Sequence, residues 1–174
     1  MEYMIMRAVA IVAASAGALI LLSTCNLLTP STKPNPSASA GELKLVTKSY
    51  RVRGKRYVPM KAEQALRYRE EGIASYYEAN GSRGSLGERL RRGELYAAHP
   101  TLPMPCQVRI TNLSNGKSCE ARVADRGPFS GRRIIDVSSA VARKLDFYSK
   151  GVQRVRVEVV TVGDGPHQLK AELD

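Results

Sequence analysis

Three short segments in the second half of the chain alternate apolar and polar residues, and this alternation is what most constrains the fold. They cover residues 108–111, 121–124 and 155–159, and Asn115-Gly116 lies between the first two. A period of two residues is typical of strands with one buried face, and Asn-Gly is a strong signal for a tight hairpin turn. The pattern predicts a small barrel that is mainly β.

One short helix is expected to interrupt these strands. Val137, Val141 and Leu145 recur every four residues, so they share one helical face, and Ser138 or Ser139 can supply the N-cap.

The remaining boundaries follow from composition. Residues 45–71 form a lead-in, with a basic, strand-like stretch over 50–60 and a short helix over 61–70. We expect the barrel to span 72–161 and residues 162–174 to form a loose tail.

The N-terminus predicts export. Residues 8–22 are apolar but short for a bilayer span, so residues 1–24 are expected to be a signal peptide. Leu22-Ser23-Thr24-Cys25 resembles the lipobox of bacterial lipoproteins, which implies a lipid anchor on Cys25; an ordinary cleaved signal is the alternative. Residues 25–44 are rich in Pro, Ser and Ala and predict a flexible tether. Asn26 resembles the pattern of lipoproteins sent to the outer membrane, facing the periplasm.

The chain is strongly basic, with 27 Lys and Arg against 16 Asp and Glu and a net charge of +11. Nucleic acid is the usual partner of such charge, but the expected export excludes it. A basic surface also attracts lipid head groups and the carboxylates of peptidoglycan.

The turn over residues 124–129, Ala-Asp-Arg-Gly-Pro-Phe, is the strongest candidate for chemistry. Gly127 and Pro128 fix the local backbone, and Asp125 directly follows an alternating strand. We therefore expect a carboxylate at a strand end with a defined direction, where it can exchange a proton.

Several blocks in order resemble the rare lipoprotein A family, the septal-ring lytic transglycosylases of bacterial envelopes. The resemblance covers about residues 45–160 and is carried by residues 50–57, 71–77, 87–88, 95–103, 108–113, 115–118, 124–129 and 151–159. It implies a six-stranded double-psi β-barrel with a short inserted helix.

The resemblance also implies an activity. Such enzymes cleave the bond between N-acetylmuramic acid and N-acetylglucosamine within glycan strands, and one carboxyl group acts first as acid and then as base to close a 1,6-anhydro ring. The expected substrate is peptide-poor peptidoglycan during septation or wall remodelling, with division-site proteins as candidate partners. No cofactor is implied. No metal site is expected either, because the chain has only two His residues and neither has ligand partners at metal spacing.

Three ionisable residues stand at the family's functional positions. The resemblance assigns Asp125 as acid and base, His99 as a residue that orients substrate or bonds to the carboxyl group, and Glu88 as a residue that holds substrate or tunes Asp125. The alternatives are an Asp that caps its turn, a structural His and a solvated loop acid.

Substrate binding is assigned to Tyr76, Tyr77 and Arg126. The family usually has Ser-Trp-Tyr-Gly where this chain has Ser-Tyr-Tyr-Glu, and Tyr76 can still stack on a sugar ring. For Arg126, an ion pair with Asp136 is the alternative to binding acidic groups of the glycan.

Cys106 and Cys119 flank the hairpin turn, and a disulfide between them is conceivable in an oxidising envelope. Symmetric pairing across the turn sets Cys119 opposite Asn112, which favours two thiols instead.

Two other functions stay open on the same fold. One is a non-catalytic, expansin-like peptidoglycan-binding lipoprotein, and the other is a structural lipoprotein that recruits division partners through its basic surface.

Overall fold

The computed structural model describes residues 45–172. The predicted signal peptide, the lipidation site Cys25 and the tether lie outside the described residues. Within residues 45–172, no helix has the length and apolar character needed to cross a membrane.

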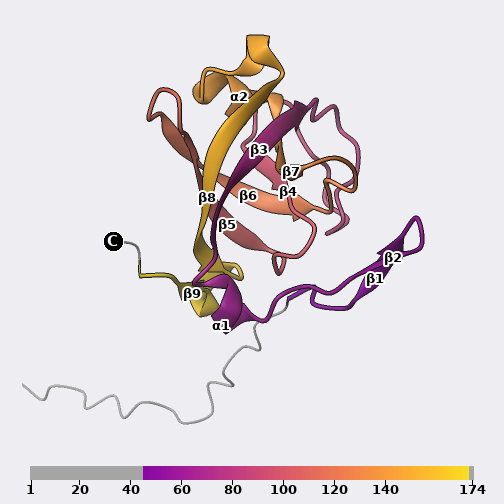
Figure 1. Ribbon diagram of the computed structural model, residues 1–174. Coiled ribbons are helices and arrows are strands. Elements are labelled where there is room, and N and C mark those ends of the chain that lie inside the picture. The colour runs from indigo at the N-terminus through magenta and orange to yellow at the C-terminus, as the bar shows by residue number, and fades with distance from the viewer. Residues whose placement is uncertain (1–44, 173–174) are drawn as a thin grey trace, which may run out of the picture. The chain divides into compact units, whose positions relative to one another are not determined.

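Six strands close into a barrel (Figure 1). Their order around the sheet is β3-β7-β4-β6-β5-β8, and pairing of β3 with β8 closes the ring. The β3–β7 and β4–β6 pairs are parallel and the other pairs are antiparallel. The strands are β3 Arg69–Tyr77, β4 Tyr96–Ala98, β5 Cys106–Asn112, β6 Ser118–Asp125, β7 Arg133–Ser138 and β8 Val152–Val162. The predicted six-stranded double-psi β-barrel is confirmed.

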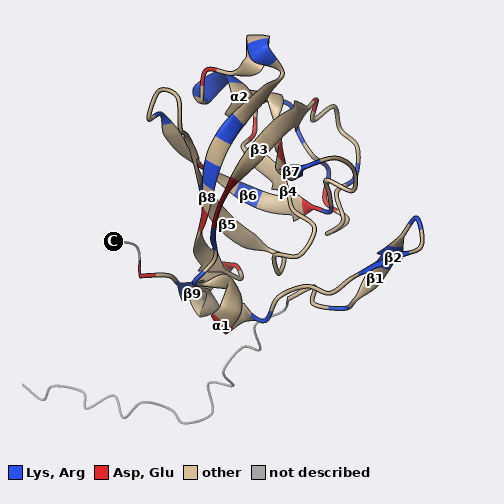
Figure 2. Cartoon of the chain, viewed as in Figure 1, with Lys and Arg blue, Asp and Glu red and all other residues tan. Residues whose placement is uncertain are grey.

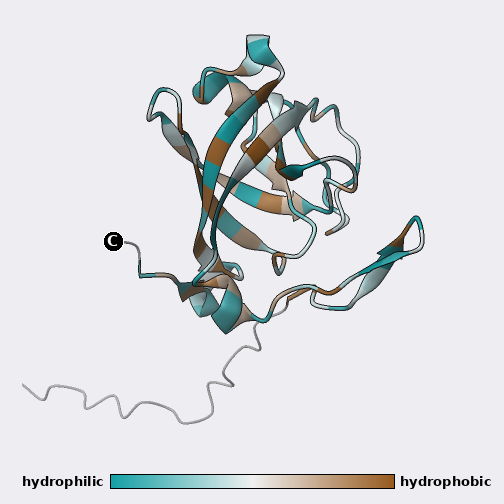
Figure 3. Cartoon of the chain, in the orientation of Figure 1, coloured by the Kyte–Doolittle hydropathy of each residue, from teal (hydrophilic) through white to brown (hydrophobic). Residues whose placement is uncertain are grey.

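The core fills the inside of this barrel. Every second residue of β5 is buried from Cys106 to Asn112, and β8 alternates in the same way, so the predicted period-two pattern is present in both strands. Figure 3 shows the alternation as brown and teal bands along β8. Phe147, Leu102 and Ile110 are among the largest fully buried side chains of the core.

The predicted helix is present as α2 Ser139–Lys144, and Val141 and the C-cap residue Leu145 are fully buried. Val137, which was expected on the same helical face, lies in β7 instead. Ser138 occupies the N-cap position, but its hydroxyl does not cap the helix. It donates to the Glu94 carbonyl and accepts from the Tyr96 N–H, so it ties the start of α2 to β4.

Three details differ from the sequence-based prediction. The barrel begins at Arg69 rather than near Gly72. The predicted loose tail is wrong for the described part: η2 Gly165–His167 leads into β9 Leu169–Lys170, which pairs with the end of β8. The backbone groups of β9 thereby pair with the end of β8, an edge that would otherwise be unpaired.

The β5–β6 register also differs from symmetric pairing across Asn115-Gly116. Cys119 lies opposite Ile110 and Cys106 lies opposite Val123. Both cysteines are free thiols, which corrects the disulfide alternative, because residues at these positions do not face each other across the ladder.

The lead-in forms a separate hairpin followed by one helical turn (Figure 1). Its elements are β1 Tyr50–Val52, β2 Lys55–Tyr57 and α1 Ala62–Ala65. Elsewhere in the chain, the 3-10 turn η1 Tyr148–Lys150 follows α2.

Candidate functional site

A row of side chains crosses four neighbouring strands and places two carboxylates on one face. Asp125 of β6 pairs with Ala98 of β4, Ala98 pairs with Asp136 of β7, and Asp136 pairs with Ser75 of β3. Residues directly opposite in a ladder point to the same face, and strands lie about 4.8 Å apart. The Cα atoms of the two aspartates are therefore about 10 Å apart, with only the methyl group of Ala98 between them in the row.

A β-bulge turns Asp125 to this outer face. Ala97 pairs with Val123 but Ala98 pairs with Asp125, so Ala124 is an extra residue in β6. Val123 lies in the core. In a regular ladder Ala98 would pair with Ala124, and Asp125 would point inward like Val123, because side chains alternate along a strand. The bulge thus delivers a carboxylate to the surface at the end of a buried strand.

One oxygen of the Asp125 carboxylate is fixed by hydrogen bonds. Oδ1 accepts from the Ser85 N–H at 3.1 Å, from the Ser85 hydroxyl, and from the Arg126 N–H at 2.7 Å. These donors fix the orientation of the carboxylate. In the part of the chain that the structure describes, Oδ2 accepts no hydrogen bond, so it is the oxygen left for a ligand.

Asp136 is a site residue that sequence reasoning did not assign. Its Oδ1 accepts from the Ser75 hydroxyl at 2.6 Å and forms an ion pair with Arg133 at 3.0 Å. Arg126 does not pair with it, so that alternative was wrong. The signal in the sequence is an acidic residue in the middle of the apolar strand Ile134-Ile135-Asp136-Val137.

Of the two adjacent tyrosines, only Tyr77 shares the face of the carboxylates. Tyr76 pairs with the core residue Val137, and its ring lies 4.7 Å from that of Tyr148. Tyr77 is partly buried, and its hydroxyl has no hydrogen-bond partner among residues 45–172. Burial raises the pKa of Tyr77, and the negative charges of Asp125 and Asp136 raise it further.

His99 lies directly after β4, and its ring is buried in a hydrogen-bonded chain. Nδ1 accepts from the N–H groups of Thr101 at 3.1 Å and Leu102 at 2.9 Å. Because Nδ1 is an acceptor, the ring proton is assigned to Nε2, which lies 3.0 Å from the Tyr68 hydroxyl. That hydroxyl donates to Glu70 at 2.7 Å.

The His99 ring therefore stays neutral and acts through the backbone. Burial, together with the positive charge of Arg126, lowers the pKa of His99 to about 3. Its backbone N–H donates to the carbonyl of Asp125 at 3.1 Å, so fixing the loop after β4 also fixes the end of β6.

The guanidinium of Arg126 is committed to backbone carbonyls. It donates to Leu102 at 2.6 Å and to Val46 at 3.0 Å, and it lies 5.4 Å from the centre of the Tyr50 ring. This position makes Arg126 a brace between the Asp125 turn and the lead-in.

Glu88 is paired with Arg122 and not with Asp125. It forms an ion pair with Arg122 at 3.2 Å, and Arg122 also pairs with Asp164. The loop that carries Glu88 also supplies Ser85. A second apolar cluster holds this loop against the barrel: Ala79, Leu90, Tyr96 and Ala124, with Tyr77 packed beside them.

A cavity of about 580 Å³ borders Asp125. Ser85, Arg126 and Phe129 line it from the barrel side, and Tyr50 and Val52 line it from the hairpin. Among residues 45–172, no three His, Cys, Asp or Glu side chains are grouped so as to hold a metal ion.

Fold and site together define a class of protein, a double-psi β-barrel that presents two carboxylates on the outer face of its sheet. The chain belongs to the family described as lytic transglycolase, which matches residues 69–157. The resemblance to rare lipoprotein A is confirmed.

Similar proteins bear matching names. The chain is 48% identical over 118 residues to the endolytic peptidoglycan transglycosylase RlpA of Neisseria meningitidis, which covers 67% of this chain and 48% of that protein. It is 48% identical over 111 residues to the protein of the same name from Pseudomonas aeruginosa, covering 63% of this chain and 32% of that protein. The chain thus spans about half the length of the first relative and about a third of the second.

A solved structure, the expansin of Clavibacter michiganensis, aligns with a TM-score of 0.46 and 17% identity, over 57% of this chain and 54% of that one.

Proposed function

We propose that this chain is an endolytic peptidoglycan transglycosylase that forms 1,6-anhydro-N-acetylmuramic acid ends. The observation that carries the proposal is the bulge that presents Asp125 beside a cavity. Its Oδ1 is held by hydrogen bonds, and its Oδ2 accepts none from residues 45–172. The family match and the names of the relatives support the same reaction.

In the proposed reaction, Asp125 handles the proton at Oδ2. The protonated carboxyl group gives its proton to the glycosidic oxygen as the bond to N-acetylglucosamine breaks. The carboxylate then removes the proton from the 6-hydroxyl of the muramoyl residue, whose oxygen attacks the anomeric carbon and closes the ring. The proton leaves on the released sugar and is replaced from the 6-hydroxyl, so the group returns to its starting state.

The other site residues have supporting roles. The second carboxylate, Asp136, stabilises positive charge that develops on the sugar ring. His99 positions Asp125 through the backbone, and Glu88 holds Arg122. We also propose that the protein works on peptide-poor glycan in the cell envelope, attached to the outer membrane through Cys25, where division proteins can contact it.

One observation favours a second candidate, glycan binding without cleavage. The Asp125 carboxylate borders a cavity and is held by three hydrogen bonds on Oδ1, so Oδ2 can accept a hydrogen bond from a sugar hydroxyl without transferring a proton.

The deciding experiment is mass spectrometry of the products released from peptide-stripped glycan. The wild type should form anhydro ends, and Asp125→Asn should lower kcat by at least about a hundredfold. Asp146→Asn is the matched control, because Asp146 is exposed and pairs with Lys117 away from the cavity. Absence of anhydro products from a folded wild type that still binds glycan would favour the binding module.

A further inference from the structure

Residues 45–61, which we call the arm, form one wall of the Asp125 cavity although they precede the barrel and the family match. Both ends of the arm are fixed to the loop after His99. The Val46 N–H donates to the Met104 carbonyl at 2.7 Å, and the Met60 N–H donates to the Thr101 carbonyl at 2.7 Å. The hairpin is therefore held beside the cavity and is not a loose extension.

Aromatic rings cover the junction between the arm and the barrel. The Tyr50 and Tyr57 rings are stacked with centroids 5.3 Å apart, and Phe129 packs edge-on at 5.4 Å from Tyr57. The Tyr50 hydroxyl donates to the Pro100 carbonyl at 2.6 Å, which fixes the stack. Tyr57 is only half-buried, so ring surface is left for an apolar face of a ligand.

The arm is also the most one-sided charged segment of the described chain. It contains six Lys or Arg and no Asp or Glu. All six are exposed, and none forms an ion pair with a residue in the described range. Figure 2 shows the hairpin carrying blue and no red.

The hairpin geometry concentrates this charge at a cost. Arg51 lies directly opposite Arg56 in the register, an arrangement that is unfavourable for like charges. Arg53 adopts a positive φ of 49° at the turn, which is uncommon for a residue other than Gly. A bound anion would relieve the repulsion.

We propose that the arm is a docking element for the glycan strand, in which the rings of Tyr57 and Phe129 contact sugar faces and the cations bind muramoyl carboxylates. The proposal rests on the proposed function, because it places this strand next to Asp125. The carboxylates are either the lactyl groups of stripped glycan or those of stem peptides. An anionic membrane is less suited, because the aromatic stack is joined to the cavity wall and not displayed as a separate apolar tip.

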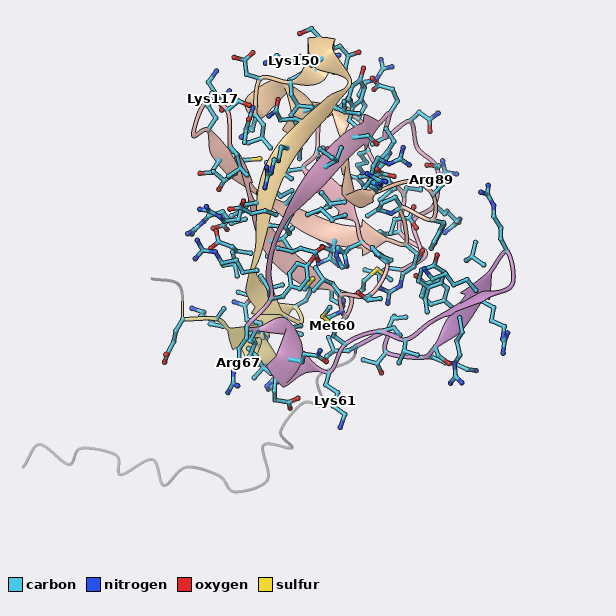
Figure 4. The ribbon with its side chains drawn as sticks, in the orientation of Figure 1. Met60, Lys61, Arg67, Arg89, Lys117 and Lys150 are labelled. Carbon is cyan, nitrogen blue, oxygen red and sulfur yellow. The ribbon has the colours of Figure 1, made fainter. Side chains whose placement is uncertain are left out.

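The test uses the full-length chain carrying Asp125→Asn, so that binding is measured without turnover. The arm variant replaces Arg51, Arg53, Lys55 and Arg56 by Gln. The control variant makes the same change in charge elsewhere, at the exposed residues Arg67, Lys144, Lys150 and Lys170. Figure 4 shows Arg67 beside α1 and Lys150 at the α2 end, both away from the hairpin strands.

Affinity is measured by co-sedimentation with sacculi at low salt. We expect the arm variant to bind about tenfold more weakly, since several exposed charge pairs each contribute little, and the control to change less than about twofold. When the carboxylates of the sacculi are amidated, the wild type should bind them as weakly as the arm variant binds untreated sacculi. Comparison of stripped with intact sacculi identifies which carboxylates are bound.

Equal losses in the arm and control variants would overturn the proposal, as would an arm dependence seen with anionic lipid vesicles but not with sacculi. The arm variant is also made with Asp125 intact, where docking predicts a higher KM at unchanged kcat. Anhydro products formed with an unchanged KM would refute docking alone. Absence of products from the wild type, with arm-dependent sedimentation retained, would refute the transglycosylase alone.

Discussion

His99 predicts a specific loss of stability in mild acid. Its pKa is about 3 in the folded protein because of burial and Arg126, against an ordinary value of 6.5. Below pH 6.5 the unfolded chain takes up a proton at His99, whereas the folded chain does not until about pH 3. The unfolded state then binds more protons, so stability falls as the pH falls through this window.

The size of the effect follows from the two pKa values. A pH of 5 lies 1.5 units below the His99 pKa of 6.5 in the unfolded chain (6.5 − 5 = 1.5) and well above the folded value of about 3. This difference corresponds to a loss of about 2 kcal/mol of unfolding free energy. For a domain of this size, that loss lowers the melting temperature by about 6–10 °C.

The assay is urea unfolding at pH 7 and pH 5 for the wild type and His99→Asn. Asparagine keeps an acceptor near the Thr101 and Leu102 N–H groups but does not titrate, so carboxylates contribute alike to both proteins. The wild type should lose about 2 kcal/mol more than the variant between the two pH values. Equal losses in both proteins would refute the reasoning. A glycan-cleavage rate that depends on a His99 pKa near 6.5 would show that the ring is not kept neutral in the folded protein.

Two further changes test the surroundings of Asp125. A Cβ at Gly84 would lie 2.6 Å from the Ala124 carbonyl oxygen. Gly84→Ala should therefore destabilise the protein by about 1–3 kcal/mol, measured by thermal unfolding. An unchanged melting temperature would contradict the tight packing of this loop against the bulge. Tyr77→Phe removes a buried hydroxyl that lacks a partner in the described chain, so stability should stay within about 0.5 kcal/mol or rise, and a loss above about 1 kcal/mol would reveal a bond that the structure does not contain.

The sequence was sufficient for features that depend on local pattern. Period-two alternation and Asn115-Gly116 predicted the β5–β6 hairpin. The spacing of Val137, Val141 and Leu145 predicted α2, although Val137 itself lies in β7. The position of Asp125 at a strand end followed from the strand before it.

Features set by long-range packing could not be obtained in this way. Whether Tyr76 or Tyr77 faces the carboxylates depends on the register of β3 against β7, and a shift of one residue exchanges them. Asp136 joins Asp125 only through β4, which lies between their strands in the sheet. Arg126 was predicted to bind acidic groups of the glycan. Its actual partners, the carbonyls of Leu102 and Val46, come from segments distant in sequence and could not be identified from local pattern.

Closure of the barrel by β3 and β8 has a consequence for the order of folding. Arg69 pairs with Glu158 and Ser75 with Val152, so the ring is completed by residues almost at opposite ends of the barrel sequence. Such distant pairing forms late, because a long loop must be closed before its contacts stabilise it. The barrel therefore cannot close until β8 has been synthesised. That delay suits a protein expected to cross a membrane before it folds, and it leaves the β3 edge unprotected until then.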